Sequence, residues 1–532
     1  MKKLYEKNSE NYIRKFFKKN NWQPLDFQIE AWDSYSRGES GIIQVPTGCG
    51  KTYAALMGPL LKLKEQNFSK GINILLVTPL KALSRDLKKS IINAIQFFDA
   101  NISVGIRNGD TSNYEKRKQI IKPPNILITT PESLTLLIAN KESNKLFSNL
   151  FSIIIDEWHE LMGCKRGNQC ELALSWLRGN NNNIQIWAMS ATMGNIEEAA
   201  SSILGLSCKQ PKIIKSNIVK SIEIKSVIPD KIGTFPWSGH LGIKSHKSLI
   251  KEIDKSKSTL IFTNTRNQSE RWFQCLRYFN PEMEDNIALH HGSLDKEDRK
   301  LVEEGVKEGS IKWVVCTSSL DLGVDFQPVD QIVQIGSAKN IGRLIQRAGR
   351  SAHKPGGISK ILFMPTNALE LLEVSAMRRL INKGITEKIN IPELSYDVLL
   401  QHLVTLACGP GFDPNIEKER IKNCLSYRNL KDEDWNWCLD FLEYGGRCLK
   451  AYPKYKKIEK IYEFNNKNNF KYIVKDKTLI RIHKFNIGTI TSDKSVIVKY
   501  IKGKSLGSLE ENFASKLKIG DTFFFAGKML EF

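Results

Sequence analysis

The sequence predicts an α/β fold built on two parallel β-sheets, and three observations support this prediction. Short runs of β-branched, apolar residues recur along the chain, and helical patterns separate them, which is the order of parallel α/β units. These runs form two groups, one within residues 22–210 and one within residues 211–388. Beyond residue 388 the pattern changes first to amphipathic helices and then, from residue 454, to strands of period two.

We therefore expect a basic N-terminal extension (1–21), two α/β domains (22–210 and 211–388), a helical module (389–453) and a partial β-rich domain (454–532). With 532 residues the chain has room for three or four domains of ~150 residues each. Its hydrophobic content of 41% is sufficient for packed cores and excludes global disorder.

The charge and cysteine content narrow the class of protein. A net charge of +22, from 79 Lys and Arg against 57 Asp and Glu, indicates a polyanionic partner, with nucleic acid first. Lys, Asn and Ile are abundant throughout, so part of the excess reflects general composition. No two of the ten cysteines are separated by only two residues, which argues against a zinc site and a disulfide framework.

The sequence shows no targeting or membrane segment. The basic start MKKLYEKNSENYIRKFF lacks a signal-peptide core, and no apolar run reaches the ~20 residues of a membrane span. We expect a soluble, cytoplasmic protein with no membrane partner.

The stretch SIIIDEWHEL joins a buried strand to a cluster of ionisable residues. Ser152–Ile155 is wholly apolar after its first residue, and Asp156, Glu157, Trp158 and His159 follow directly. Acids at the carboxyl end of a parallel strand stand over the crevice where α/β sheets bind ligands. Two adjacent carboxylates repel each other unless a cation shares them, which favours a bound metal. The alternative is that Asp156 begins a turn or caps the next segment.

The segment GIIQVPTGCGKTYAALMGPLL predicts a strand (41–45), a Gly-rich turn and a helix. In such a loop the backbone N–H groups and the helix N-terminus cradle phosphates; Lys51 would reach the β- and γ-phosphates, and the Thr52 hydroxyl would ligate Mg²⁺. Val45 stands where the strict P-loop pattern has glycine, so a chance match or a purely structural turn is the alternative. The residues expected to hold the nucleotide are Thr47, Gly48, Gly50, Lys51 and Thr52.

Together the two motifs predict a nucleoside-triphosphate hydrolase domain. Asp156 would hold Mg²⁺ through water, and Glu157 would orient or deprotonate the water that attacks the γ-phosphate. His159 is expected to link this site to the adjoining domain, and a purely structural histidine is the alternative. Such a site sits at the same sheet edge as the Gly-rich loop.

The second group of strands, STLIFTNT, IALHHG, IKWVVCTSS and QIVQIGS, carries no P-loop and ends in the amphipathic helix IGRLIQRAGRSAH. A nucleotide held between two such domains needs cations from the second one to stabilise transition-state charge. Arg350 and Arg347 are the candidates for this role, and Gln346 beside them is included among the catalytic residues. Arg343 is a third arginine of the same helical stretch. The alternative is an exposed basic helix face.

The ordered set FQIEAW, PTGCGKT, TPLKAL, TTPES, DEWHEL, SAT, FTNTR, HHGS, TSSLDLGVDF and QRAGRSAH resembles the signature of the superfamily-two helicases. The KRG that follows DEWHEL, with FPWSGHLG and CTSSLDLGVDF, resembles the Lhr-type helicases, and among them the bacterial ligase-associated DEXH-box (Lhr-Core-like) branch. The resemblance runs from about Trp22 to the C-terminus. It implies two tandem RecA-like P-loop NTPase domains, then a winged-helix module and the start of a β-rich C-terminal domain.

The resemblance also implies residue roles. Gln28 would recognise adenine, since an amide pairs with its N6 and N7, so ATP is the expected nucleotide. Ser190 and Thr192 would couple hydrolysis to strand movement, and Gly323 and Asp325 would contact the nucleotide from the second domain. The residues implied to track the nucleic-acid backbone are Thr78, Lys81, Thr130, Thr263, Arg266, His291 and Thr317. Hydroxyl and basic groups suit phosphates, although any one of these Thr residues is equally well an ordinary strand residue. In many members of the superfamily the last motif ends with Arg, whereas this chain has His353 there. Arg350 is therefore the safer assignment for the arginine finger, the cation that stabilises transition-state charge.

The C-terminal third begins with helical patterns, ELSYDVLLQHLVTLACG and DEDWNWCLDFLEYGG. Trp435 and Trp437 are two residues apart, so on a helix they point to different faces; we expect one in the core, and the other against a base or a neighbouring domain. The β-rich pattern then stops at GKMLEF, whereas the resembling family continues, so we expect a fragment or a natural truncation with exposed strand edges.

The expected function is that of an ATP-dependent, monomeric translocase on a single nucleic-acid strand that unwinds duplexes. DNA as the track, RNA:DNA hybrids as a further duplex substrate, movement from 3′ to 5′ and a role in DNA repair are implied by the resemblance alone. The same holds for a bacterial cytosol or nucleoid location and for a pathway shared with a DNA ligase and a nuclease. The alternatives are an RNA helicase, a nucleic-acid clamp or inactive fragment that does not cycle, and the motor subunit of a complex that would need a nuclease partner.

Overall fold

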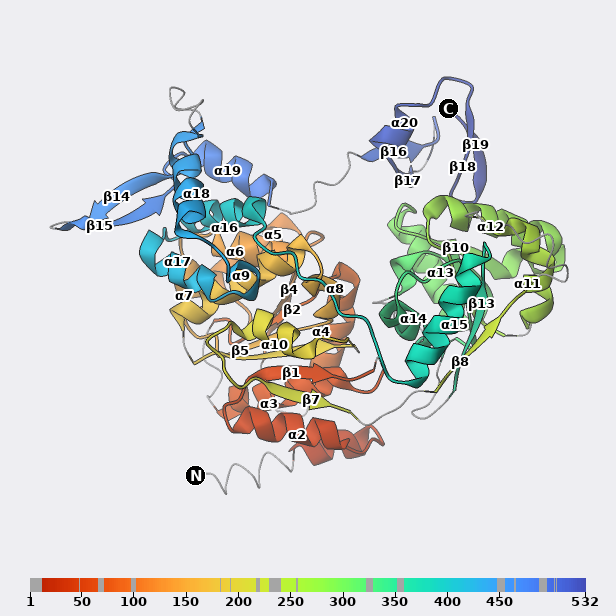
Figure 1. Cartoon of the computed structure of the whole chain (residues 1–532), viewed down its shortest axis with the longest axis horizontal. Helices are drawn as coiled ribbons and strands as arrows, with labels where there is room; N and C mark the ends of the chain where they lie inside the picture. Colours follow the sequence, from red (N-terminus) through yellow and green to blue (C-terminus); the bar gives the residue numbers. More distant parts are fainter. Residues whose placement is uncertain are drawn as a thin grey trace. The chain divides into compact units, whose positions relative to one another are not determined.

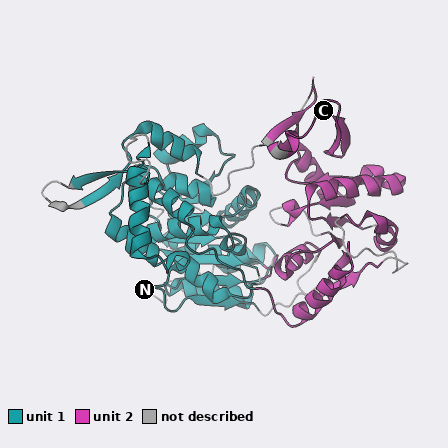
Figure 2. Cartoon of the chain, turned by 45° about the horizontal axis from the view of Figure 1, so that its top comes forward, with its two compact units in different colours: residues 1–45, 50–216, 388–489 teal, residues 46–49, 217–387, 490–532 magenta. Residues whose placement is uncertain are grey.

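The computed structural model describes most of the chain and divides it into two compact units (Figures 1 and 2). Unit 1 comprises residues 1–45, 50–216 and 388–489, and unit 2 comprises residues 46–49, 217–387 and 490–532. The described residues are 12–46, 48–65, 71–96, 102–181, 183–191, 193–216, 221–228, 241–254, 257–321, 329–351, 358–446, 455–463, 466–487, 495–501, 503 and 505–532.

Unit 1 contains a seven-stranded sheet in the order β3-β4-β2-β5-β6-β1-β7, with every neighbouring pair parallel. The strands are β1 (Gly41–Gln44), β2 (Ile74–Val77), β3 (Val104–Arg107), β4 (Ile126–Thr129), β5 (Ser152–Ile155), β6 (Gln185–Ser190) and β7 (Lys212–Lys215). The strands β1, β2, β4, β5 and β6 are buried along their whole length, because their β-branched and apolar side chains face helices on both sides of the sheet.

Helices connect these strands and cover the sheet (Figure 1). They are α2 (Asp26–Ser36), α3 (Lys51–Glu65), α4 (Lys81–Ile95), α5 (Asn113–Ile121), α6 (Pro131–Ile138), α7 (Ser143–Leu146), α8 (His159–Met162), α9 (Lys165–Asn180) and α10 (Ile196–Leu204). In α9 the residues from Gly167 to Leu177 are all buried, so this helix is covered on every side. The order places the carboxyl ends of β1, β2, β4, β5 and β6 at one edge, which is where parallel α/β sheets bind ligands.

The later part of unit 1 is a helical module that packs on α9. Its elements are α16 (Tyr396–Cys408), α17 (Pro414–Lys422), α18 (Asp432–Tyr444), α19 (Lys477–Phe485) and the antiparallel pair β14 (Glu459–Glu463) and β15 (Asn466–Ile473). Leu399 and Leu403 of α16 share one hydrophobic core with Leu172 of α9 and with the sheet. The module and the parallel sheet are therefore parts of the same folded body.

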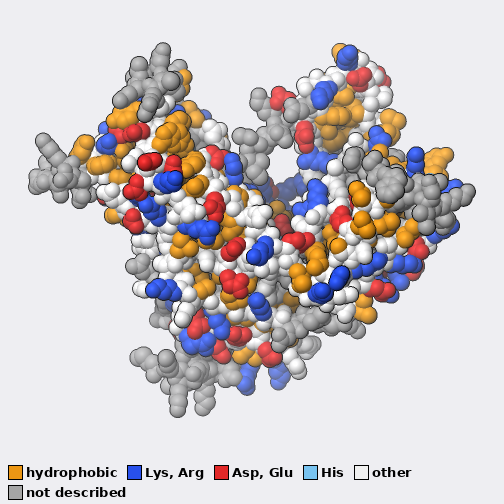
Figure 3. Space-filling view, in the orientation of Figure 1, with side chains coloured by type: hydrophobic (Ala, Val, Ile, Leu, Met, Phe, Trp, Pro, Cys, Tyr) orange, Lys and Arg blue, Asp and Glu red, His pale blue; other side chains and the backbone are white. Residues whose placement is uncertain are grey.

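The two tryptophans of α18 have different environments. Trp435 is only 2% exposed and belongs to the shared core, whereas Trp437 is 53% exposed. The Trp437 ring stacks on Phe441, with ring centroids 5.2 Å apart. Figure 3 shows hydrophobic side chains beside acidic ones on this part of the surface, and on the face shown Lys and Arg are interspersed with Asp and Glu. One tryptophan is thus a core residue, as expected.

Unit 2 contains a six-stranded parallel sheet in the order β10-β11-β9-β12-β13-β8. Its strands are β8 (Ile222–Ser226), β9 (Thr259–Phe262), β10 (Ile287–His290), β11 (Trp313–Cys316), β12 (Gln331–Ile335) and β13 (Ser359–Met364). Its helices are α11 (His246–Glu252), α12 (Arg266–Phe279), α13 (Lys296–Glu308), α14 (Ile341–Ala348) and α15 (Leu369–Asn382). Separate apolar clusters cover the two faces of the sheet. The two parallel sheets confirm the predicted fold class.

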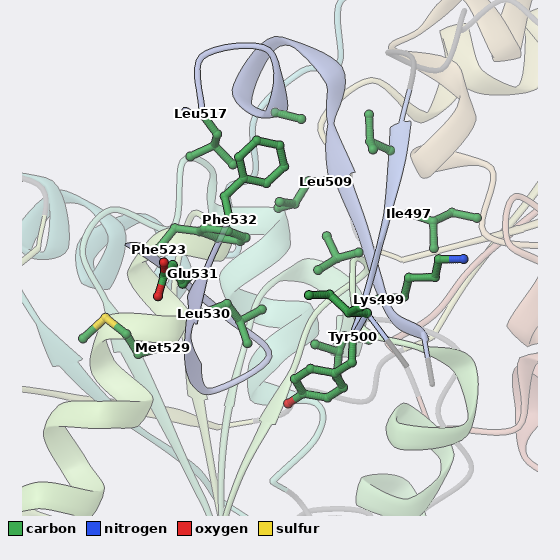
Figure 4. Close-up of a pocket in the computed structure, with 15 residues that line it drawn as sticks. Ile497, Lys499, Tyr500, Leu509, Leu517, Phe523, Met529, Leu530, Glu531 and Phe532 are labelled. Atoms are coloured by element: carbon green, nitrogen blue, oxygen red, sulfur yellow. The ribbon is translucent and has the colours of Figure 1, made fainter. Parts of the chain in front are cut away.

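The last residues of the chain add two antiparallel hairpins to unit 2. They are β16 (Ser495–Lys499) with β17 (Ser505–Glu510), and β18 (Thr522–Phe525) with β19 (Lys528–Glu531), joined by α20 (Glu511–Ala514). An apolar cavity of about 560 Å³ opens between them, and Figure 4 shows Leu509, Leu530 and Phe532 among the residues that line it. The predicted single β-rich segment 454–532 is divided between the two units at residue 489, and it includes helices α19 and α20 as well as strands.

The backbone of the β18–β19 turn is held by a buried carboxylate of α12. Glu270 is 4% exposed and accepts hydrogen bonds from the N–H groups of Ala526 (2.6 Å) and Gly527 (2.7 Å). Gly527 has φ +74° and a Cβ there would lie 2.5 Å from the Phe273 ring, so this position of the turn requires glycine.

Among the described residues, no helix is both long enough and apolar enough to cross a membrane.

Candidate functional site

The Gly-rich loop of the sequence follows β1 and leads directly into α3. Gly48 has φ +78° and Gly50 has φ +83°, a backbone region that residues with a Cβ adopt rarely. The first helical residue is Lys51, so the unpaired N–H groups of the first turn and the positive end of the helix dipole lie immediately after the loop. This is a local structure that binds anions. Thr47, also predicted to hold the nucleotide, lies outside the described residues.

Gln28, predicted to recognise adenine, lies against the end of this loop. Its side chain is 3% exposed. The amide donates to the Gly50 carbonyl (3.0 Å), and its oxygen accepts from the Leu25 N–H (2.9 Å). A Cβ at Gly50 would approach the Gln28 Nε2 to 2.7 Å. The structure thus brings Gln28 together with the loop, and its role in base recognition stays a prediction.

Asp156 and Glu157 follow β5 and are both 7% exposed. The Lys51 Nζ lies 3.3 and 3.2 Å from the two carboxylate oxygens of Glu157. Glu157 has φ +45°, which is unusual for a residue with a side chain and is found at functional sites where the surrounding structure enforces it. The Asp156 N–H donates to Val77 and the Trp158 N–H to Met189, so hydrogen bonds to β2 and β6 hold the turn on both sides.

The charges of this cluster are not balanced. Burial and the neighbouring Glu157 carboxylate raise the pKa of Asp156 to about 7, and Lys51 opposes the rise only in part. Burial also acts to raise the pKa of Glu157, but attraction to Lys51 and His159 and the hydrogen bond from Lys51 together outweigh it and lower that pKa below the usual value. Two buried carboxylates therefore share one cation, and the site would gain from a second positive charge.

A divalent cation fits this deficit. Among the described residues no group of three or more His, Cys, Asp and Glu side chains could enclose a metal alone. Mg²⁺ does not need such a cage, since it keeps several waters and binds through one or two protein oxygens together with substrate phosphates. Asp156 and Thr52, the second residue of α3, would supply those oxygens.

His159, the first residue of α8, bridges the acids to the end of β6. Its Nδ1 accepts a hydrogen bond from the Ala191 N–H (3.2 Å) and lies 3.2 Å from the Ser190 hydroxyl. The same atom is 3.5 Å from Glu157, and the Nε2 faces Glu160 at 3.5 Å. The structure thus brings together three residues of two predicted motifs, Glu157, His159 and Ser190. Thr192 lies outside the described residues, and the coupling role stays a prediction.

The arginines predicted as fingers lie on and just after α14 in unit 2, and they differ in environment. Arg347 is 1% exposed. Its guanidinium donates to both Asp321 oxygens (2.8 and 3.2 Å) and to Gln334, and it lies 4.5 Å from the centre of the Phe262 ring. These contacts bind Arg347 inside unit 2, which is an unfavourable state for a finger that must reach a phosphate.

Arg350 is half-buried and donates to the backbone carbonyl of Asp321 (3.0 Å). This acceptor is a neutral backbone carbonyl, whereas the acceptor of Arg347 is the Asp321 carboxylate. Gln346 is buried beside Arg347. Gly323 and Asp325, the predicted nucleotide contacts from this domain, lie outside the described residues, as does His353.

In unit 1 the predicted nucleic-acid contacts gather at the carboxyl ends of β2 and β4, which are adjacent in the sheet. Lys81 is the first residue of α4 and pairs with Asp110 (3.1 Å) on the surface. Thr130 caps α6 by accepting from the Ser133 N–H. Thr78 is fully buried, with its hydroxyl directed to Leu80. Of the three, Lys81 alone presents a largely exposed side chain.

In unit 2 the corresponding candidates follow the adjacent strands β9, β10 and β11. Arg266 begins α12, is half exposed and pairs with Glu510 (3.4 Å). His291 is 1% exposed, and its Nε2 lies 3.0 Å from Glu270. The Thr263 hydroxyl donates to Cys316, and Thr317 is 9% exposed. His291 and Thr263 are thus internal residues in this structure, and Arg266 is the exposed member of the set.

Two residues with evident structural importance were not singled out from the sequence. Arg166 forms hydrogen bonds to both oxygens of Glu132 (2.5 and 3.3 Å) and to the Pro79 carbonyl (2.7 Å), so it ties the TPLKAL and TTPES segments together. Asp321 holds Arg347 and lies 3.5 Å from Arg343. The KRG triplet was a signal for Arg166, whereas nothing in the sequence pairs Asp321 with α14.

The two parallel α/β units, the Gly-rich loop with its acidic partner strand, and the arginine helix of the second unit are together the features of the superfamily-two helicases. Family models agree: the DEAD/DEAH box helicase model matches residues 25–199, the helicase conserved C-terminal domain residues 244–354, and the winged helix domain of the large helicase-related protein residues 379–532. The chain belongs to the Lhr family of these helicases.

Similar proteins come from archaea and bacteria. The chain is 32% identical over 519 residues to the ATP-dependent helicase Lhr-Core protein 2 of Thermococcus barophilus, covering 93% of this chain and 59% of that protein. It is 33% identical over 537 residues to the ATP-dependent helicase Lhr-Core of Methanocaldococcus jannaschii, covering 98% and 62%. The chain thus spans about 60% of the length of these relatives.

A solved structure of Mycobacterium smegmatis helicase Lhr bound to ssDNA and AMP-PNP superposes with a TM-score of 0.78 at 26% identity, covering 91% of this chain and 62% of that one. The predicted superfamily, its Lhr branch and the succession of two parallel-sheet domains and a winged-helix domain are confirmed. The narrower prediction of a bacterial ligase-associated member stays a prediction, since the relatives named above are archaeal as well as bacterial.

Proposed function

We propose that this chain is an ATP-driven motor that moves along a single nucleic-acid strand and separates duplexes. The observation that carries the proposal is the buried cluster of Lys51, Asp156, Glu157, His159 and Ser190. In this cluster Lys51 pairs with Glu157, whose backbone lies in the left-handed region. A module that only binds nucleic acid has no need for either residue, because neither Lys51 nor Glu157 contributes to strand binding.

The residues of unit 1 divide the chemistry among them. The N–H groups of the loop and of the first turn of α3 bind the phosphates, and Lys51 exchanges Glu157 for the β- and γ-phosphate oxygens. Glu157, released from Lys51, then orients the attacking water and accepts its proton. Thr52 and Asp156 would hold Mg²⁺, and the ion would neutralise phosphate charge. Gln28 selects adenine, and Gly323 and Asp325 complete the nucleotide contacts.

Arg350 is the finger we propose for the developing negative charge, with Gln346 beside it and Arg347 holding the helix. An arginine supplied in this way accelerates phosphoryl transfer by about 10³–10⁵-fold in comparable enzymes. His159, Ser190 and Thr192 transmit the state of the nucleotide to the strand. Along the track, the exposed Lys81 and Arg266 are the first phosphate contacts we propose. Thr78, Thr130, Thr263, His291 and Thr317 are buried in this structure, and we propose that they support the same track from beneath its surface.

We further propose DNA as the track, movement from 3′ to 5′, action as a monomer and a role in repair beside a ligase and a nuclease. The ssDNA-bound relative supports DNA over RNA, and the family resemblance supports the other points. RNA:DNA hybrids are a second duplex substrate of the same motor.

The test is the ATPase rate of the 532-residue chain without nucleic acid, with single-stranded DNA and with single-stranded RNA. We expect stimulation by DNA, and we expect Glu157→Gln to lower the stimulated rate by at least about 100-fold while DNA binding persists. Stimulation by RNA alone would identify an RNA helicase instead. Strand binding with steep salt dependence but no stimulated hydrolysis would identify a clamp and contradict the proposal.

A further inference from the structure

The short segment between α15 and α16 is attached on one side to Asn195, which follows the SAT motif, and on the other to the start of α14 through its own Glu387. The chain passes from unit 2 to unit 1 between Glu387 and Lys388. Hydrogen bonds within each unit fix the residues on either side of this crossing, Glu387 in unit 2 and Ile389 in unit 1. We call residues 387–395 the strap.

Asn195 anchors the unit 1 side of the strap. Its Nδ2 donates to the Ile389 carbonyl (3.0 Å), and its Oδ1 accepts from the Ile389 N–H (2.9 Å). The amide thus pairs with one peptide residue as a neighbouring β-strand would. Asn195 stands five residues after Ser190, is 5% exposed and occupies the N-cap position of α10 without capping it. A buried asparagine at this position normally accepts from a backbone N–H of its own helix. Here the Asn195 oxygen accepts from the strap instead, while its Nδ2 donates both to the strap and to Glu198 of α10 (2.5 Å).

Glu387 anchors the unit 2 side. Its carboxylate accepts from the N–H of Ile341 (2.6 Å), the first residue of α14, which carries Arg347 and precedes Arg350. An anion at a helix N-terminus interacts favourably with the helix dipole and with the unpaired N–H groups of the first turn. The strap is therefore attached to the start of the arginine helix.

The rest of the strap is fixed to unit 1. Asn168 of α9, a helix that begins shortly after the DEWHEL motif, donates to the Pro392 carbonyl (2.8 Å) and to the Ser395 hydroxyl (3.0 Å). Ile389 and Ile391 pack against the core of this unit. The strap also forms one wall of a cavity of about 450 Å³ that Asn195 and Arg428 help to line. It then continues into α16 without further irregular chain.

These contacts leave no slack at the crossing. Lys388 alone separates the two anchored residues and is exposed. Since consecutive Cα atoms are 3.8 Å apart, the Cα atoms of Glu387 and Ile389 can be separated by at most about 7–8 Å. A shift of the backbone after Ser190 is thus passed to the N-terminus of α14 through one residue. The reverse transmission follows the same path.

We propose that Asn195 and Glu387 are positioning residues of a taut strap, which couples ATP hydrolysis to movement of the strand by linking the backbone after the SAT motif to the arginine helix. Asn195 and Glu387 are not among the residues assigned to the nucleotide or to the strand, so replacing them should change coupling and not chemistry. The proposal rests on the proposed motor function.

The test compares two rates on the full chain under the same conditions: ATP hydrolysis stimulated by single-stranded DNA, and separation of a duplex with a 3′ single-stranded tail. We expect Asn195→Ala and Glu387→Ala each to lower the amount of duplex separated per ATP hydrolysed by about 10-fold, with the stimulated ATPase within about 2-fold of wild type. Because the two anchors act on one strap, the double variant should be no worse than the more affected single one. Glu387→Gln keeps an acceptor for the Ile341 N–H and should recover most of the coupling.

Two further variants separate the strap from general effects on folding. Three glycines inserted after Lys388 remove no contact but introduce slack, and they should uncouple the enzyme as the anchor variants do. Asn423→Ala removes another asparagine that joins the module to the sheet domain, through hydrogen bonds to Ser207 (2.7 and 3.1 Å), and should leave the ratio unchanged. Unaltered ratios in both anchor variants, or equal falls in the two rates, would overturn the strap. A wild-type chain without stimulated hydrolysis or strand separation would instead overturn the motor function.

Discussion

Asp156→Asn should make the nucleotide-free protein more stable at pH 8 while it abolishes activity. The wild-type carboxyl is 7% exposed, and burial with Glu157 nearby raises its pKa to about 7. An acid whose pKa is raised by folding stabilises the folded state at low pH, and this contribution is lost as the pH rises through the folded pKa. Asn is neutral at every pH and has almost the same shape, so it avoids the loss.

The magnitude follows from the two pKa values. The usual pKa of an aspartate carboxyl is 3.8 and the pKa of Asp156 in the folded protein is about 7, and each pKa unit corresponds to about 1.4 kcal/mol. The stability difference between Asp156→Asn and wild type should therefore grow by about 2–3 kcal/mol from pH 5 to pH 8. At pH 8 the variant should unfold several degrees above wild type, since about 1 kcal/mol moves the midpoint by 2–4 °C in domains of 150–250 residues. Titrating groups that are distant from Asp156 affect both proteins equally and cancel in the comparison.

The assay is differential scanning calorimetry of both proteins from pH 5 to pH 8.5, without nucleotide and with Mg²⁺ and a non-hydrolysable ATP analogue. With the ligands, wild type should unfold at a higher temperature than Asp156→Asn, the reverse of the order without them. The reason is that binding to the folded state adds stability only where the site is intact. A variant that is less stable than wild type at pH 8, or a difference that does not depend on pH, would refute the charge-deficit reasoning.

Two pairs of substitutions test the remaining assignments. Trp435→Ala should lower the free energy of unfolding by about 3–5 kcal/mol, whereas Trp437→Ala should change it by less than about 0.5 kcal/mol; calorimetry checks both, and equal effects would contradict the assignment of Trp435 to the core. Arg347→Ala should destabilise unit 2 by about 3–5 kcal/mol because it leaves the Asp321 carboxylate buried without its partner. Arg350→Ala should leave the unfolding temperature near wild type and lower the DNA-stimulated ATPase by at least about 100-fold, and a folded Arg347→Ala with the larger loss of rate would reverse the two roles.

The parallel sheets and the meeting of Lys51 with the DEWH acids could be predicted from the sequence. Four-residue β-branched strands such as β5 occur in buried parallel sheets, and residues at their carboxyl ends meet at one edge. No knowledge of tertiary packing was needed for either step. The 3.2 Å contact of Lys51 with Glu157 follows from that rule.

Other choices depended on contacts between distant residues. Arg347 and Arg350 are three residues apart and have similar positions on a helical pattern, so the sequence could not say which one Asp321 would bind. For Trp435 and Trp437 the pattern separates two faces but does not say which face meets the core. Asn195 resembles an ordinary N-cap residue in the sequence, and its hydrogen bonds to Ile389 depend on a segment almost 200 positions later.

The burial of α9 on all sides has a practical consequence for work with this chain. A recombinant form that ends after the second parallel sheet, near residue 388, would leave the face of α9 that now packs on α16 and α17 exposed to water. Large apolar faces of this kind cause aggregation. The smallest soluble preparation of the first ATPase unit should therefore retain residues 388–489. If the chain works as the proposed motor, residues 388–489 should move together with the parallel sheet of unit 1.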